Sequence, residues 1–162
     1  MKKLLIIAAL SLGFAVAANA QDFRLGGRLG SGLQAQAEYC YNGADYIEGR
    51  LGMAWYHAGA ITADFTVLHN WNITTMDWTP SAGMWFLDAG AGLTIGGKQN
   101  VVTLGAAGCA KIGIEFNDVP LRLSLDWTPA FGPVIGYVDG YSEAAFNEYG
   151  LANLGISAVF RF

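Results

Sequence analysis

The sequence is poor in charge and, beyond its first twenty residues, in long apolar runs. Only 14% of its 162 residues are charged, although 53% are hydrophobic. After residue 20 no stretch offers the roughly 18 uninterrupted apolar residues that a membrane-spanning helix requires. Basic residues are also scarce: removing Lys2 and Lys3 leaves seven of nine against thirteen acidic residues, a net charge of −6. This acidic balance argues against nucleic acid as a partner.

The apolar run that does exist lies at the start of the chain and is typical of a secretory signal peptide. Lys2 and Lys3 precede an apolar segment over residues 4–17, and Ala18-Asn19-Ala20 forms a small-x-small cleavage motif. An uncleaved membrane anchor is the alternative. We expect residues 1–20 to be removed after export by the Sec route, leaving residues 21–162 as one domain.

Beyond residue 20 apolar and polar residues alternate, a period of two that favours β-strands over helices. Turn signals such as Asn42-Gly43 and Asn117-Asp118 separate the alternating runs. The pattern predicts eight strands, over residues 22–31, 33–41, 46–57, 60–71, 82–96, 101–116, 119–132 and 149–162. We expect residues 72–81 to form a connection and residues 133–148 to form the longest loop.

Each predicted strand has one face without charge, and the opposite face collects nearly all charges of the strands. The charged face holds six bases and six acids, namely Arg24, Arg28, Arg50, Lys111, Arg122, Arg161, Glu38, Glu48, Asp64, Asp88, Glu115 and Asp126. Glycine and alanine lie between these long side chains, which indicates limited room. Equal numbers of both signs in a crowded space are typical of a barrel interior, where an unpaired charge is very costly.

We therefore predict that the charged face lies inside and the apolar face outside, an arrangement that is stable in lipid if the barrel closes. A tilted strand needs about 9–11 residues to span a membrane, and the predicted strands have that length. The predicted fold is all-β, a single eight-stranded antiparallel up-and-down transmembrane β-barrel. A soluble lipocalin-like binder is the alternative, and it requires the opposite facing of every strand.

Three features of the sequence together resemble the small eight-stranded outer-membrane barrels of the OmpA/OmpX-like class. They are the signal peptide, the eight alternating segments and the final stretch Ser157-Ala158-Val159-Phe160-Arg161-Phe162. The resemblance implies the outer membrane of a Gram-negative-type bacterium, surrounded by membrane lipid. It also implies that Phe160 and Phe162 belong to the C-terminal signal that the barrel-assembly machinery reads during biogenesis.

In that class both chain ends face the periplasm, so residues 133–148 are expected outside the cell. This loop is acidic and aromatic, with the candidate surface residues Tyr137, Asp139, Tyr141 and Glu143. We expect a non-enzymatic protein that serves envelope structure or surface interaction, with no cofactor and an unknown extracellular partner. A narrow diffusion channel and a lipid-modifying enzyme are the alternatives.

The enzymatic alternative depends on His57 and His69, because with these histidines the chain resembles lipid A deacylase barrels, which use a histidine with a serine nearby. That class has a serine two positions after its histidine, whereas Gly59 and Trp71 occupy those positions here. Histidines among aromatic residues at the rim are the simpler interpretation. No His, Cys and Asp cluster has metal-ligand spacing, so no metal is expected.

The two cysteines, Cys40 and Cys109, fall on the predicted inner face of the second and sixth strands. These strands are opposite in an eight-stranded ring, so the two Cα atoms should exceed the ~7 Å limit for a disulfide. We expect free thiols.

Overall fold

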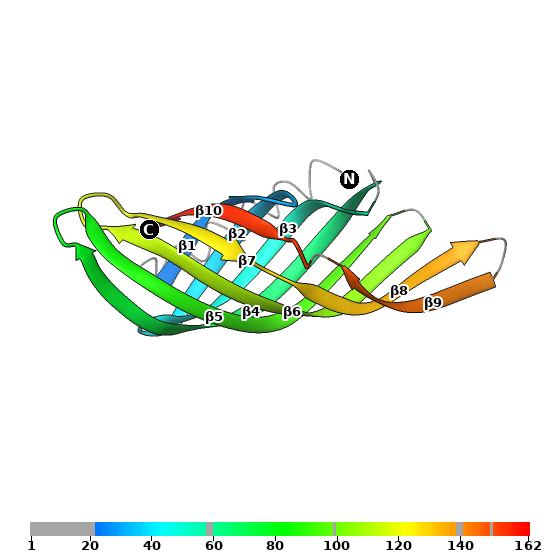
Figure 1. Ribbon diagram of the computed structural model, residues 1–162. Coiled ribbons are helices and arrows are strands. Elements are labelled where there is room, and N and C mark those ends of the chain that lie inside the picture. The colour runs from blue at the N-terminus through cyan, green and yellow to red at the C-terminus, as the bar shows by residue number, and fades with distance from the viewer. Residues whose placement is uncertain (1–21, 58–59, 99, 139–140, 150) are drawn as a thin grey trace, which may run out of the picture.

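The computed structural model describes residues 22–57, 60–98, 100–138, 141–149 and 151–162, and these form a sheet of ten strands (Figure 1). The strands are β1 (Phe23–Leu29), β2 (Gly32–Asn42), β3 (Asp45–His57), β4 (Ala60–Thr79), β5 (Gly83–Lys98), β6 (Val101–Phe116), β7 (Leu121–Trp127), β8 (Ala130–Val138), β9 (Tyr141–Tyr149) and β10 (Leu154–Arg161). Within the described ranges, no helix is long and apolar enough to cross a membrane.

Eight of the strands close into a ring. The strands β1 to β7 pair antiparallel in chain order, β7 pairs with β10, and β10 returns to β1. Closure satisfies the backbone groups that an open sheet would leave unpaired at its edges. The predicted all-β class and the antiparallel ring of eight are therefore confirmed.

Two of the ring strands are extended by a hairpin. β7 and β8 both pair with β6 in one register, as Lys111↔Asp126 and Thr103↔Val134 show. Pro129 separates them because it has no amide to donate, but its carbonyl still accepts a hydrogen bond from the Gly108 amide at 2.9 Å. β8 and β9 then project beyond the ring at the end of the barrel away from the C-terminus (Figure 1).

The prediction of a loop over residues 133–148 is wrong. β8 and β9 pair from Ala130↔Tyr149 to Val138↔Tyr141, so most of the segment is a hairpin. Its β-branched and aromatic residues favour strands, but the glycines and Pro133 concealed this pattern. Of the candidate surface residues, Tyr137, Tyr141 and Glu143 lie on these strands, and Asp139 lies outside the described residues.

The prediction of a connection over residues 72–81 is also wrong, because β4 continues to Thr79. The pairing of β4 with β5 shifts register between Asn72 and Thr74 and again between Met76 and Thr79. Such β-bulges place an extra residue in one strand and interrupt its alternation. Period-two patterning therefore does not reveal the part of β4 beyond Asn72.

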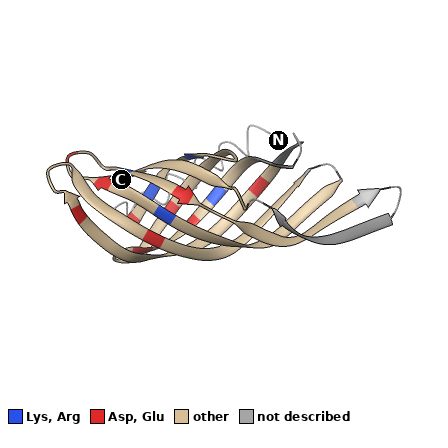
Figure 2. Cartoon of the chain, in the orientation of Figure 1, with Lys and Arg blue, Asp and Glu red and all other residues tan. Residues whose placement is uncertain are grey.

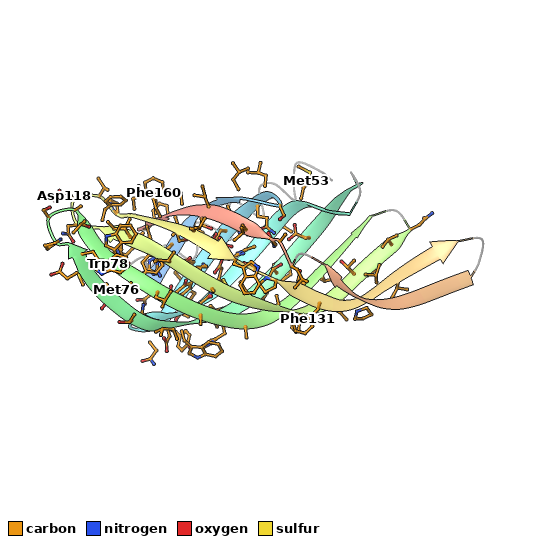
Figure 3. The ribbon with its side chains drawn as sticks, in the orientation of Figure 1. Met53, Met76, Trp78, Asp118, Phe131 and Phe160 are labelled. Carbon is orange, nitrogen blue, oxygen red and sulfur yellow. The ribbon has the colours of Figure 1, made fainter. Side chains whose placement is uncertain are left out.

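The barrel has an inverted distribution of polarity. Large fully buried side chains include Arg28, Arg50 and Lys111, whereas the outer wall carries apolar side chains. Met53 and Phe131 extend away from the ribbon (Figure 3). The exposed apolar residues of the outer wall include Leu25, Leu29, Leu33, Leu51, Phe65, Leu93, Leu104, Leu125, Leu154 and Ile156.

Candidate functional site

The charged barrel interior is the candidate functional site, and each strand of the ring contributes to it. Ten of the twelve residues that the sequence assigns to the inner face are buried, namely Arg24, Arg28, Glu38, Glu48, Arg50, Asp64, Asp88, Lys111, Arg122 and Asp126. Glu115 is partly buried and Arg161 is exposed, with a side chain 53% accessible. Figure 2 shows basic and acidic positions on neighbouring strands of the barrel.

Most of these side chains form one connected network of opposite charges. Successive ion pairs form a chain that runs, in order, through Arg161, Glu115, Arg24, Glu38, Lys111, Glu48, Arg50, Asp126 and Arg28. A side branch starts at Glu115, which contacts Arg122, and Arg122 in turn pairs with Asp88. Buried charges are stable only when they are paired and hydrogen-bonded. The network therefore ties strands that are not neighbours in the ring.

Glu48 of β3 occupies the middle of the network. It forms ion pairs with Arg50 on its own strand and with Lys111 of β6. The Asn70 amide of β4 donates a further hydrogen bond to Glu48 Oε2 at 2.9 Å. Lys111 also lies 3.5 Å from Glu38 Oε1. These contacts cross the interior, because β6 is not adjacent to β2 or β3.

Asp126 of β7 is the most heavily hydrogen-bonded carboxylate of the network. Arg28 Nε donates to both of its oxygens, at 2.8 and 3.0 Å. The Thr128 and Ser157 hydroxyls donate at 2.9 and 3.0 Å, and Arg50 Nη1 lies 3.5 Å away. Several donors around one buried carboxylate compensate for its lost hydration.

Gly155 of β10 makes room for the guanidinium of Arg28. A Cβ atom at this glycine would lie 2.5 Å from Arg28 Cζ. Any side chain here would force the Arg28 guanidinium to shift. The small size of Gly155 thus accommodates one particular long side chain, that of Arg28.

The network ends near the C-terminus at Glu115 of β6. Three arginines approach this carboxylate, with nitrogen–oxygen distances of 3.1 Å for Arg161, 3.3 Å for Arg24 and 3.9 Å for Arg122. Because Glu115 is partly exposed, solvent screens these pairs more than the pairs around Glu48.

Arg122 joins this end to Asp88 of β5, with which it forms an ion pair. Its guanidinium also lies over the ring of Phe86, with 3.5 Å between Cζ and the ring centroid, a cation–π geometry. The Tyr46 hydroxyl donates to Asp88 Oδ2 at 2.8 Å, and Asn72 Nδ2 donates to Oδ1 at 2.8 Å.

Several uncharged residues of the interior were absent from the sequence-based site. They are Gln34, Gln36, Tyr46, Asn70, Thr128, Asn153 and Ser157, and all of them are buried. Most of these residues lie an even number of positions from a charged inner-face residue of the same strand, so the alternation of the sequence places them on the inner face as well. Charge alone does not reveal the neutral donors that complete the network.

Both cysteines are free thiols on the described strands. Cys40 is half-buried, and Cys109 is buried in a small apolar cluster with Leu68, Ala107 and Ala130. The Cys109 sulfur lies 3.8 Å from Arg50 Nη2 and 3.7 Å from the Thr128 hydroxyl oxygen.

His69 lies on the other face of β4, outside the network. Its Nε2 atom and the Tyr41 hydroxyl share a hydrogen bond, and its ring centroid is 4.4 Å from that of Trp71. The side chain of His57 lies outside the described residues. In the described part of the chain, no three His, Cys, Asp or Glu side chains are grouped to hold a metal ion.

Comparison with known proteins supports the architecture. The chain is similar to the solved N-terminal β-barrel domain of Pseudomonas aeruginosa OprF, with a TM-score of 0.51 over 86% of this chain and 95% of that domain. The two are 16% identical, so the likeness shows the fold alone. No family model and no curated protein matches the sequence. The chain therefore has the closed eight-stranded β-barrel fold of the OmpA-like kind, with a hairpin extending two of its strands.

Proposed function

We propose that this chain is an integral outer-membrane β-barrel with a closed, salt-bridged interior, and that it serves envelope structure or surface interaction. The observation that carries the proposal is the inverted polarity of the wall. On β10, for example, Ile156 is exposed while Ser157 is buried against Asp126. An outer wall of this composition is stable in lipid and aggregates in water.

Aromatic residues support a membrane boundary near the C-terminal end of the barrel. Trp71 and Trp78 are exposed there, and the rings of Trp78 and Trp85 lie 5.4 Å apart. Phe160 and Phe162 are exposed on the same end. Tryptophan, tyrosine and phenylalanine form belts of this kind at the two interfaces of transmembrane barrels.

The interior favours a closed barrel over a diffusion channel. An eight-stranded barrel is just wide enough for its side chains to fill, and here Arg28, Arg50 and Lys111 occupy it fully buried. Each of them is in an ion pair. An ion crossing the barrel would have to separate these pairs, so we propose that the resting protein conducts little.

The β8–β9 hairpin is the segment that we propose for surface interaction. With the C-terminus in the periplasm, this hairpin projects from the extracellular end. Its sequence contains Tyr137, Tyr141, Glu143 and Glu148, so it would present acidic and aromatic groups to a partner. The partner's identity does not follow from these residues.

The experiment that tests the proposal is cell fractionation combined with heat-modifiable gel migration. We expect the mature chain, beginning at Gln21, in the outer-membrane fraction. Unheated samples should migrate differently from boiled samples, because a closed barrel resists detergent unfolding at room temperature. Recovery in the soluble periplasmic fraction with no heat-dependent shift would contradict membrane insertion.

Two further measurements test the non-enzymatic, closed state. We expect lipid A mass spectra to be the same before and after overexpression, because His69 is paired with Tyr41 and has no serine two positions on. Loss of an acyl chain from lipid A would establish an enzyme instead. Planar-bilayer recordings should show little steady current, whereas a stable open conductance would establish a channel.

A further inference from the structure

Asp64 of β4 differs from the other carboxylates of the described interior. Its residue is 2% exposed, yet no described lysine or arginine forms an ion pair with it. Its Oδ2 atom accepts a hydrogen bond from Gln34 Nε2. Its Oδ1 atom is buried and has no hydrogen-bond partner. A buried carboxylate oxygen without a donor carries a large desolvation cost.

The charge of the network favours an ionised Asp64. The network contains six cations, Arg24, Arg28, Arg50, Lys111, Arg122 and Arg161, and five carboxylates, Glu38, Glu48, Asp88, Glu115 and Asp126. It thus has one excess positive charge. Arg28 Nη1 donates to Gln34 Oε1 at 3.3 Å, and Gln34 in turn donates to Asp64. Gln34 therefore separates Asp64 from Arg28 while linking the two, which leaves Oδ1 available.

Gly52 and Gly96 are the cross-strand neighbours of Asp64 on β3 and β5, so neither adjacent strand places a side chain beside it. A Cβ atom at Gly52 would lie 2.9 Å from Gln34 Cγ, so the Gln34 side chain occupies that side of Asp64. A Cβ atom at Gly96 would lie 2.9 Å from Thr103 Oγ1 and 3.6 Å from Asp64 Cβ. The Thr103 hydroxyl of β6 and Asp64 of β4 thus both lie next to the Gly96 position.

The neighbouring positions are rich in hydroxyl oxygens. Thr66 and Thr94, the next inward residues of β4 and β5, are buried and share a hydrogen bond of 2.9 Å between their hydroxyls. Carboxylate and neutral oxygens around a small space are the ligands that hard cations prefer. The rest of the interior instead surrounds its carboxylates with Lys and Arg.

We propose that Asp64 binds a monovalent cation such as sodium, with the Thr103 hydroxyl as a neighbouring ligand. With Asp64 ionised the six basic and six acidic charges of the interior already balance, so a monovalent cation adds one positive charge to the interior, whereas a divalent ion would add two. The bound cation supplies the missing partner of Oδ1. The inference concerns the barrel interior and does not depend on the proposed envelope role.

The main test is the urea stability of the refolded barrel in detergent, in sodium chloride and in N-methylglucamine chloride at equal ionic strength. For the wild type, sodium at ten times its dissociation constant should raise the folding equilibrium constant about tenfold over the organic cation. Asp64→Asn keeps the shape of the side chain but removes its charge, and should abolish this difference. Thr103→Val should reduce it.

Asp118→Asn is the matched control, because Asp118 is an exposed acid in the β6–β7 turn and the change removes the same charge. It should retain the sodium response. An equal response in Asp64→Asn and wild type would overturn the proposal. A wild type that is insensitive to sodium but is stabilised as the pH falls would also overturn it, because Asp64 would then be protonated.

If Asp64→Asn does not fold, wild-type crystals soaked in rubidium chloride provide a second test. Rubidium is a monovalent cation with a usable anomalous signal. The proposal expects an anomalous peak beside Asp64 Oδ1, and the absence of a peak at that position would overturn it.

Discussion

The two faces of β7 (Leu121–Trp127) have opposite character although they share one backbone. Leu125 is 51% exposed on the outer wall, whereas the next residue, Asp126, is 1% exposed in the interior. In a water-soluble barrel the leucine would be inside. The interior is held together by directed polar contacts, whereas the apolar side chains of the outer wall are left exposed.

The two faces should therefore respond differently to substitution. On the inner face a change removes one of several specific contacts, so its cost depends on how many partners are left unpaired. On the outer face the proposed membrane placement makes the cost depend on the transfer of a side chain between lipid and water.

The largest effect is expected for Arg122→Ala on the inner face. It leaves Asp88 without its cation, although Tyr46 and Asn72 still donate to it. Breaking a buried ion pair from one side costs about 3–5 kcal/mol. The urea midpoint of refolding in detergent should fall accordingly. An unchanged midpoint would show that Arg122 does not lie in the interior.

The next effect is expected for Leu125→Arg on the outer face. An arginine on the lipid-facing wall of a barrel costs about 2–4 kcal/mol near the bilayer midplane. The measurement is the urea midpoint of folding into lipid vesicles, with Leu125→Ala as an apolar control of smaller volume. If Leu125→Arg were as stable as Leu125→Ala, the outer wall would not face lipid.

A smaller effect is expected for Gly155→Ala, which changes the space of the interior and not its charge. The new methyl group would displace the Arg28 guanidinium from Asp126, and overpacking of this kind costs about 1–3 kcal/mol. Gly49→Ala is the control, because a Cβ atom there meets nothing within 4 Å. Equal urea midpoints for the two variants would contradict the packing of Arg28 against Gly155.

The smallest effect is expected for Arg161→Ala at the open end of the network. Arg161 is half-exposed, and Glu115 keeps Arg24 and Arg122 as partners. Exposed ion pairs contribute about 0–1 kcal/mol. The same urea titration should place this variant close to wild type, and a loss as large as that of Arg122→Ala would show that the network does not weaken toward its end.

The sequence is sufficient to predict the facing of residues wherever a single strand carries the information. The alternation of Leu123 and Leu125 with Arg122 and Asp126 predicts which side chains share a face, because successive residues of a strand point in opposite directions. It failed where the strand departs from that period. The bulges after Asn72 concealed the end of β4, and Pro133 concealed β8.

The partners within the candidate site could not be predicted in the same way. Glu48 and Lys111 are 63 positions apart in the sequence, and β3 and β6 are not neighbours in the ring. Their contact exists because the sheet closes and brings opposite walls within reach of long side chains. The same holds for Arg28 and Asp126, which are 98 positions apart.

The sequence by itself determined the class of structure and the facing of most strands, since period-two alternation is a property of the extended backbone. It also determined that the twelve inner-face charges balance. Only the tertiary structure decided how that balance is distributed. Closure of the ring pairs five carboxylates with six cations and leaves Asp64 without an ion pair among the described residues, because its cross-strand neighbours Gly52 and Gly96 offer no basic side chain.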